Sequence, residues 1–200
     1  MSAFDRTLRV IVADLRKLKL RWALVGGVAV SARSNPRFTN DFDFAIAVEN
    51  DTEAEASVAS MMALGYAVAA LLENEATGEM ATVRLWCRPI EGTQFIVDFL
   101  FHTCGIESEV VADAELISVL PRLEVPVATR GHLIAMKVLS VGEGRRHDAD
   151  DLVGLLEIAS ETDLAQARQA LDLMDQRGKS RDKDLQGDLN RALARVRPSP

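Results

Sequence analysis

Three aspartates and a glycine pair are the residues of this sequence whose types and spacing could support catalysis. Thirteen residues separate the pair Gly26 and Gly27 from Asp41, and Asp43 follows in the segment DFDFAIAV. Side chains alternate along a strand, so Asp41 and Asp43 would share one face while the neighbouring apolar residues take the other. These two carboxylates, joined by Asp98 from a later strand, can hold two divalent cations, and Mg²⁺ prefers such oxygen ligands.

Two cations held a few ångströms apart suit phosphoryl transfer. One can activate an attacking hydroxyl, and the other can neutralise charge on a triphosphate and its leaving pyrophosphate. The glycine pair fits this chemistry because Gly26 and Gly27 would let phosphate oxygens approach the backbone N–H groups that begin the next helix. The sequence lacks the GxxxxGKS/T and GxGxxG motifs, which disfavours a P-loop or Rossmann site.

Each of these features also has a structural explanation. A glycine pair before a helix is commonly a tight turn, and alternating aspartates commonly lie on a solvated strand edge. The order of the parts favours the catalytic interpretation. Asp98 adds a further expectation, because it lies among apolar residues of a predicted strand, where an unpaired charge is costly. We therefore expect Asp98 to have a partner.

Local patterns predict alternating helices and strands that position these residues. Residues 2–19 repeat apolar side chains at spacings of three and four, which is typical of an amphipathic helix. Further helices are predicted at 28–34, 52–64 with Thr52 as N-cap, 129–141 with Thr129 as N-cap, 148–159, 162–177 and 181–196. Strands are predicted at 22–25, 41–48 and 66–72, with a hairpin formed by 80–88 and 94–101. Residues 102–127 give no clear pattern.

The pattern changes from mixed elements to helices alone near residue 125. We therefore expect an α+β protein in which residues 1–125 form the core that holds the glycine pair and the aspartates. Residues 126–200 are expected to form a helical region. A chain of 200 residues with 48% hydrophobic side chains can bury a core without disulfides or a structural metal.

Composition disfavours several classes of protein. No apolar run approaches the roughly 18 residues of a membrane span, and no secretion signal is recognisable, so we expect a cytoplasmic protein without a membrane partner. Cys87 and Cys104 stand outside any CxxC spacing, which argues against zinc and a disulfide. The net charge is −7, and the acidic middle of the chain argues against sequence-independent wrapping of nucleic acid, which needs many phosphate contacts. Residues 1–40 carry 8 basic and 2 acidic side chains and still allow a local basic surface.

The segments ALVGGVAVSAR and RFTNDFDFAIAV resemble the signature of the DNA polymerase β-type nucleotidyltransferase superfamily. The chain is most similar to its AbiEii and MenT-type toxin branch, over nearly the whole length. That branch has a glycine pair before a helix, an RxTxDxD strand, and a later lysine followed by an RxxDxxD helix. The matching residues are Arg37, Thr39, Asp41, Asp43, Lys137, Arg145 or Arg146, Asp148 and Asp151. Gly27 departs from the serine of many members, and His147 from a common lysine.

The resemblance implies a small mixed sheet flanked by helices and followed by a helical region, with the active site between them. It implies an Mg²⁺-dependent nucleotidyltransferase with a two-metal site, which transfers a nucleoside monophosphate from a nucleoside triphosphate (NTP) and releases pyrophosphate. The implied acceptor is the 3′ end of tRNA, and the implied role is the toxin of a bacterial toxin–antitoxin pair with a cognate antitoxin. An antibiotic nucleotidyltransferase and a non-catalytic nucleotide-binding regulator of the same fold are the alternatives.

Motif and resemblance together assign roles to individual residues. Asp41, Asp43 and Asp98 are the expected metal ligands and, with Lys137, the expected catalytic residues. Nucleotide binding is expected of Gly26, Gly27, Arg37, Thr39, Lys137, Arg145, Arg146, Asp148 and Asp151.

Several of these residues have a second interpretation. Lys137 lies in an apolar helix and needs an anionic partner, such as a triphosphate, unless it is a surface lysine. Asp148 could instead be the N-cap of the following helix, and Asp151 an acid in its first turn. Arg37 could anchor the loop before its strand. For an RNA acceptor, we expect phosphate contacts near the active site from Arg16, Lys17, Lys19, Arg21, Arg33 and Arg37.

Overall fold

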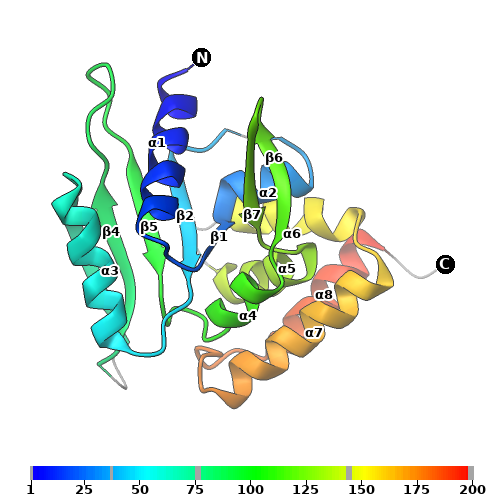
Figure 1. Cartoon of the computed structure of the whole chain (residues 1–200). Coiled ribbons are helices and arrows are strands. Elements are labelled where there is room, and N and C mark those ends of the chain that lie inside the picture. The colour runs from blue at the N-terminus through cyan, green and yellow to red at the C-terminus, as the bar shows by residue number, and fades with distance from the viewer. Residues whose placement is uncertain (1, 37, 75–77, 143–145, 198–200) are drawn as a thin grey trace.

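The structure is a computed structural model that describes residues 2–36, 38–74, 78–142 and 146–197. Figure 1 shows a twisted sheet with α1 and α3 on one side and a group of helices, α5 to α8, on the other. The helices are α1 (Ala3–Lys17), α2 (Gly26–Arg33), α3 (Asp51–Ala63), α4 (Glu107–Ala112), α5 (Arg130–Ser140), α6 (Arg146–Glu157), α7 (Glu161–Gln176) and α8 (Leu185–Val196). The strands are β1 (Trp22–Val25), β2 (Asp41–Ile46), β3 (Ala67–Glu73), β4 (Met80–Trp86), β5 (Ile96–Leu100), β6 (Glu115–Leu120) and β7 (Leu123–Val127).

The strands form one mixed sheet in the order β3-β4-β5-β2-β1-β7-β6. Strands β2 and β5 are parallel, as are β1 and β7. The other neighbouring pairs are antiparallel, including the predicted hairpin of β4 and β5. The two strands that carry the aspartates of interest therefore lie side by side near the middle of the sheet. The small mixed sheet flanked by helices confirms the predicted α+β class.

Helix α1 covers one face of the sheet because its apolar stripe meets the phenylalanines of β2. Ser2 and Asp5 form a capping box that starts the helix. The ring of Phe4 stacks on Phe42 with 4.3 Å between the ring centroids, and Phe44 contacts Trp22 edge to face. Phe42 and Phe44 are fully buried. The alternation of β2 therefore turns its two aspartates toward the opposite face of the sheet.

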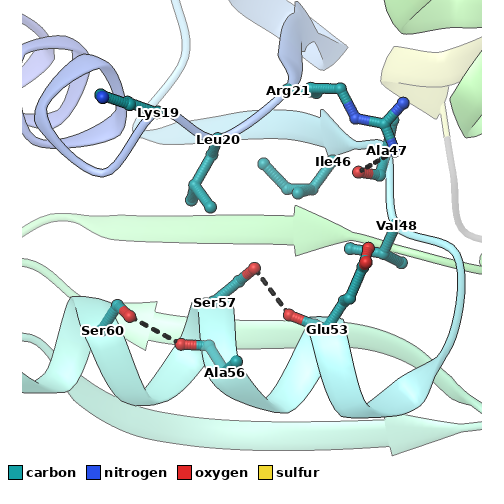
Figure 2. Close-up of a pocket in the computed structure, with 10 residues that line it drawn as sticks. All are labelled: Lys19, Leu20, Arg21, Ile46, Ala47, Val48, Glu53, Ala56, Ser57 and Ser60. Atoms are coloured by element: carbon teal, nitrogen blue, oxygen red, sulfur yellow. Dashed lines mark hydrogen bonds between the residues drawn. The ribbon is translucent and has the colours of Figure 1, made fainter.

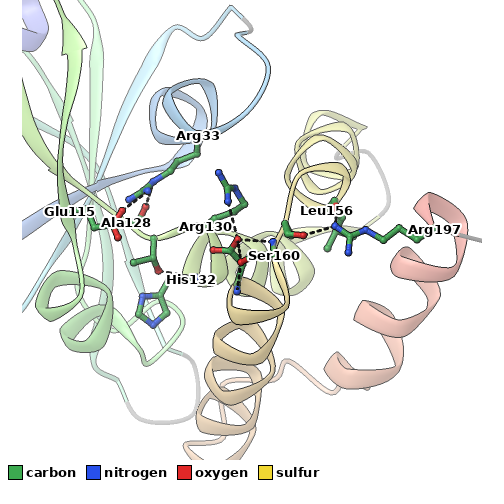
Figure 3. A network of polar contacts seen from close by, with 11 residues as sticks. Arg33, Glu115, Ala128, Arg130, His132, Leu156, Ser160 and Arg197 are labelled. Atoms are coloured by element: carbon green, nitrogen blue, oxygen red, sulfur yellow. Dashed lines mark hydrogen bonds and ion pairs between the residues drawn. The ribbon is translucent and has the colours of Figure 1, made fainter.

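Arginine side chains join neighbouring elements of the fold (Figure 3). Arg33, at the end of α2, donates to the carbonyls of Val127 and Ala128 at 3.1 and 2.9 Å and to the Glu115 carboxylate. Arg130 of α5 reaches Asp163, which also belongs to the capping box of α7. Arg197, beyond α8, donates to the carbonyl of Leu156 at the end of α6. Carbonyls at helix and strand ends thus gain donors that the helices themselves do not supply.

The elements predicted before residue 102 agree with the structure in type and place, with one cap corrected. The N-cap of α3 is Asn50, whose side chain accepts from the N–H of Glu53, and not Thr52. The N-cap of α5 is Thr129, as predicted. The stretch without a clear pattern contains α4, β6 and β7. The last helix begins at Leu185 and not at Arg181, because Arg181 and its neighbour have positive φ angles and leave the helical region of backbone conformation.

Strand β7 is the last strand, so the change to helices alone comes just after residue 125. Because β7 pairs with β1, it ties the end of the first predicted part to the middle of the sheet. The division of the chain into two parts stays a prediction. Among the described residues, no helix is long and apolar enough to cross a membrane.

Candidate active site

The carboxylates of Asp43 and Asp98 come together because their strands are parallel and in register. Asp43 of β2 lies directly opposite Asp98 of β5, and paired residues of neighbouring strands share a face. Asp41 lies on the same face of β2, opposite Ile96. Asp98 is buried, whereas Asp41 and Asp43 are half-buried. The structure thus gathers the three predicted aspartates on the face of the sheet that α1 does not cover.

Arg84 of β4 is the partner that Asp98 needs. Its Nε and Nη2 atoms donate to the two oxygens of Asp98 at 2.8 and 2.6 Å, which is a bidentate ion pair. The two residues lie directly opposite each other in the antiparallel pair of β4 and β5. The sequence analysis predicted that Asp98 has a partner, and the register of β4 and β5 identifies that partner as Arg84.

Asp43 is the electrostatic centre of this group. Burial and the neighbouring charges of Asp41 and Asp98 raise the pKa of Asp43 to about 7. The positive charge of Lys137 and a hydrogen bond from the backbone N–H of Gly27 act in the opposite direction. Negative charge at Asp43 is therefore costly, and a cation between these carboxylates would remove that cost.

The donor set fits a hard cation such as Mg²⁺, because it consists of carboxylate oxygens that repel one another. Among the described residues, no three His, Cys, Asp or Glu side chains form a ready-made metal site. Asp98 is paired with Arg84 instead. The metal-ligand roles of Asp41, Asp43 and Asp98 stay a prediction.

The glycine pair lies against Asp43. Gly26 has a φ angle of +62°, and a Cβ added there would lie 1.9 Å from Oδ2 of Asp43. Gly27 follows as the second residue of α2, and its N–H donates to Asp43. The pair therefore does more than turn the chain, because it lets the start of α2 approach the Asp43 carboxylate closely. Its contact with a phosphate stays a prediction.

We expect Gly26→Ala to abolish activity and to destabilise the protein. The added methyl group would displace the Asp43 carboxylate, and alanine is strained at this φ angle. Gly154→Ala is the matched control, because a Cβ at Gly154 in α6 meets only ordinary contacts of 3.7 Å or more. It should raise stability by up to about 1 kcal/mol. Thermal melts and a transfer assay of both variants test this, and full activity of Gly26→Ala would contradict it.

Thr39 holds the other aspartate of β2. Its hydroxyl donates to Oδ1 of Asp41 at 2.6 Å, just before the strand begins. This contact orients a predicted metal ligand, so Thr39 acts on Asp41 in the structure, whereas nucleotide binding by Thr39 stays a prediction. Arg37 and Arg145 lie outside the described residues, as does the side chain of Arg146.

Lys137 of α5 forms a buried ionic cluster with two aspartates of α6. Its Nζ atom lies 2.6 Å from Oδ1 of Asp148 and 2.8 Å from Oδ2 of Asp151. The Lys137 side chain is 10% exposed and that of Asp151 only 2%, so Lys137 is not a surface lysine. Asp148 lies in the first turn of α6, which begins at Arg146, and the N-cap interpretation of Asp148 is wrong.

The three aspartates of the sheet and the ionic cluster of Lys137 lie on either side of the junction between the sheet and the helical region. The positive charge of Lys137 lowers the pKa of Asp43 through electrostatic attraction. Helix α2, which begins at the glycine pair, packs against β2 on one side and against α5 and α6 on the other. A lysine and three carboxylates from distant parts of the sequence thus converge on one region.

Several basic residues of the first 40 lie away from the three aspartates. Arg16 is at the end of α1, which packs on the opposite face of the sheet, and it donates to the carbonyl of Glu124. A pocket of about 280 Å³ lies at the far end of β2, and Lys19 and Arg21 are among the residues that line it (Figure 2). The Arg33 side chain donates hydrogen bonds to the carbonyls of Val127 and Ala128. Arg16, Lys19 and Arg21 therefore lie away from the aspartates, and the expected phosphate contacts of the basic residues stay a prediction.

The arrangement of sheet, helices and charges is that of a nucleotidyltransferase core. A nucleotidyltransferase-like antigenic protein from Paracoccidioides brasiliensis has a similar fold, with a TM-score of 0.53 and 17% identity over 95% of this chain and 94% of that one. A protein from H. pylori named as a nucleotidyltransferase gives a TM-score of 0.50 and 14% identity over 98% and 94%. No curated protein matches the sequence.

The family can be stated more narrowly. The family model described as "Nucleotidyl transferase AbiEii toxin, Type IV TA system" matches residues 9–198, and the chain belongs to this family. Its activity is therefore NTP-dependent nucleotidyl transfer. MenT4, a nucleotidyltransferase toxin from Mycobacterium tuberculosis H37Rv, has a TM-score of 0.37 and 15% identity over 88% of this chain and 85% of that one.

Proposed function

We propose that the protein uses Mg²⁺ to transfer a nucleoside monophosphate from an NTP to the 3′ end of tRNA in the cytoplasm, as a toxin controlled by a cognate antitoxin. The observation that carries the metal-dependent chemistry is the group of three carboxylates on neighbouring strands, in which Asp43 has a pKa of about 7. Membership of the AbiEii family supports the toxin role. The RNA acceptor follows from the resemblance to MenT-type toxins.

In this proposal Asp41, Asp43 and Asp98 hold the metal. Bound there, Mg²⁺ would neutralise negative charge on the triphosphate and its leaving pyrophosphate. Thr39 fixes the orientation of the Asp41 carboxylate, and Gly27 fixes that of Asp43. The geometry of the ligands is thus set by residues next to them in the chain.

Lys137 provides the fixed positive charge for the triphosphate. Asp148 and Asp151 hold its ammonium group in place, and burial keeps its side chain from sampling other positions. In the transfer, a hydroxyl oxygen of the acceptor attacks the α-phosphorus and the bond to the β-phosphate oxygen breaks. Pyrophosphate leaves, and the hydroxyl proton passes to a carboxylate of the site or to water.

Incubation of the purified protein with each of four labelled NTPs and total RNA, resolved by size, tests the proposal. We expect label in the tRNA band, loss of the label with EDTA, and no label with Asp41→Asn. Label in no RNA band would contradict the acceptor. A labelled small product that forms only with added antibiotics would indicate a small-molecule nucleotidyltransferase, and binding of NTP without any product would indicate a regulator.

A further inference from the structure

We propose that the exposed face of β4, formed by Arg84 and Trp86 with Ala67 and Ala70 of β3, binds the single-stranded RNA end that carries the acceptor hydroxyl. We call it the β4 face. Trp86 stacks on a base of this strand, and Arg84 pairs with a backbone phosphate. The inference rests on the proposed RNA acceptor and adds the surface that holds it.

The strand register places the β4 face beside the catalytic carboxylates. One row across the sheet contains Asp43, Asp98 and Arg84, and the next contains Asp41, Ile96 and Trp86. Neighbouring strands are about 4.8 Å apart, so β4 lies roughly 10 Å from β2. An RNA strand whose terminal hydroxyl lies at the carboxylates therefore passes over β4 with its preceding nucleotides.

The β4 face is open where the rest of the strand is covered. Val83 and Leu85 of β4 are buried on the side of the sheet that α1 and α3 cover, and Arg84 and Trp86, which alternate with them, point the other way. Trp86 is 38% exposed, and the side chain of Arg84 is 44% exposed. Ala67 and Ala70 of the edge strand β3 lie opposite them, and their small side chains leave the indole and the guanidinium uncovered.

The two tryptophans of the chain show the contrast between a core position and this face. Trp22 is 6% exposed and packs edge to face on Phe44, as a core aromatic does. Trp86 is exposed to solvent, and it lies in the same row across the sheet as Asp41. A planar aromatic surface of this kind stacks on any base, whatever the sequence of the strand.

Arg84 supplies the charge that the stacking surface needs. The ion pair with Asp98 uses Nε and Nη2, and among the described contacts Nη1 has no hydrogen bond, so it is available to a phosphate oxygen. A guanidinium binds phosphate well because its donors lie in one plane. An RNA strand, which has both bases and phosphates, uses both residues.

Fluorescence measures the first contact directly, because Trp22→Phe leaves Trp86 as the single tryptophan. The probe is a single-stranded RNA oligonucleotide with a 3′-deoxy end, which binds without reacting. We expect it to quench the emission of Trp86. Trp86→Ala should weaken RNA affinity about tenfold and raise KM for RNA with little change in kcat, while Trp86→Phe recovers part of the affinity. Affinity for free NTP should not change.

A second variant separates the charge from the ring. Arg84→Gln should weaken RNA binding and lower the salt dependence of its affinity by about one phosphate contact. The matched controls are Leu116→Ala, at a 72% exposed position of β6 on the other edge of the sheet, and Arg191→Gln, whose guanidinium pairs with Asp188. Both controls should bind RNA like the wild type.

The outcomes distinguish this inference from the proposed function. If the wild type labels tRNA and Trp86→Ala binds and labels it equally well, the β4 face is not the acceptor surface, although the function stands. If the wild type neither binds nor labels RNA, the acceptor and this surface are both wrong. If Trp86→Ala impairs transfer only to an added antibiotic, the face serves a small acceptor and the inference is overturned.

Discussion

Asp43→Asn should abolish nucleotidyl transfer and at the same time stabilise the metal-free protein at neutral and alkaline pH. The pKa of Asp43 is about 7 in the folded protein, against 3.8 for an ordinary aspartate. The folded state therefore binds a proton at Asp43 more tightly than the unfolded state does. Stability is lost as pH rises from about 4 to about 7, and the loss is constant above that range.

Asparagine removes this loss because it carries no charge beside Asp41 and Asp98. Its side-chain oxygen can still accept the hydrogen bond from Gly27. A shift of about three pKa units corresponds to at most about 4 kcal/mol. We expect the gain at pH 8 to be a substantial part of that value and to vanish near pH 4.

Thermal melts in EDTA at pH 4 and pH 8, for wild type and Asp43→Asn, measure the effect. Addition of Mg²⁺ and an NTP should then raise the melting temperature of the wild type much more than that of the variant. Glu55→Gln, at an exposed position of α3, is a charge-matched control that should change neither stability nor activity. Equal stability of wild type and Asp43→Asn at pH 8, or transfer by the variant, would remove Asp43 from the centre of the site.

The aspartate face could be predicted from the sequence because strand alternation is a local property. Asp41 and Asp43 must share a face wherever β2 lies, and Phe42 and Phe44 then show which face is buried. The same logic predicted that Asp98 has a partner. It could not name Arg84, since that depends on the register of two strands, which is set by the turn between them and by the packing of both.

The choice between neighbouring caps shows a different limit. Asn50 and Thr52 are both good N-cap residues, and a propensity cannot decide between two of them that are two positions apart. The structure selects Asn50, whose backbone is extended and whose side chain reaches the N–H of Glu53. The position at which α3 begins therefore depends on where the preceding strand β2 ends and how the chain continues from it.

Charge counts along the sequence could not place a basic surface beside the aspartates, because a count does not show which face of the fold a side chain takes. Residues before position 41 do carry an excess of basic side chains, but α1 lies on the sheet face opposite Asp41 and Asp43, and Arg16 is at the end of that helix. Several of them also bond carbonyls at the ends of other elements, as Arg16 and Arg33 do. The ion pair of Arg84 with Asp98, in a strongly acidic segment, could be found only from the fold.

The sequence left two interpretations of Lys137, a nucleotide-binding residue or a surface lysine. Its buried ion pairs lead to the second prediction of a large effect, on stability. Lys137→Met should destabilise the protein by about 3–5 kcal/mol, because the buried Asp151 carboxylate would lose the ammonium group that lies 2.8 Å from it. For a chain of this length that is a fall in melting temperature of roughly 10 °C. Lys137→Arg should keep part of the stability, although a planar guanidinium does not reproduce the contacts of an ammonium group.

Lys179→Met is the matched control for this loss. The Lys179 side chain is 11% exposed, much like that of Lys137, but Glu79, its partner at 3.2 Å, is 45% exposed and can be hydrated when the lysine is removed. The loss of stability should therefore be much smaller, and transfer should continue. Equal stability of Lys137→Met and the wild type would show that the ion pairs do not contribute to folding.

The double variant Lys137→Met with Asp151→Leu separates the structural role of Lys137 from its role toward the nucleotide. Apolar side chains of similar size can replace a buried ion pair at little cost, so the melting temperature should recover toward that of the wild type. Affinity for NTP and the rate of transfer should remain low at every pH, because the positive charge near Asp43 is still missing. Calorimetric titration with an NTP and the labelled transfer assay measure both. A stable double variant that binds and transfers nucleotide normally would limit Lys137 to a structural role.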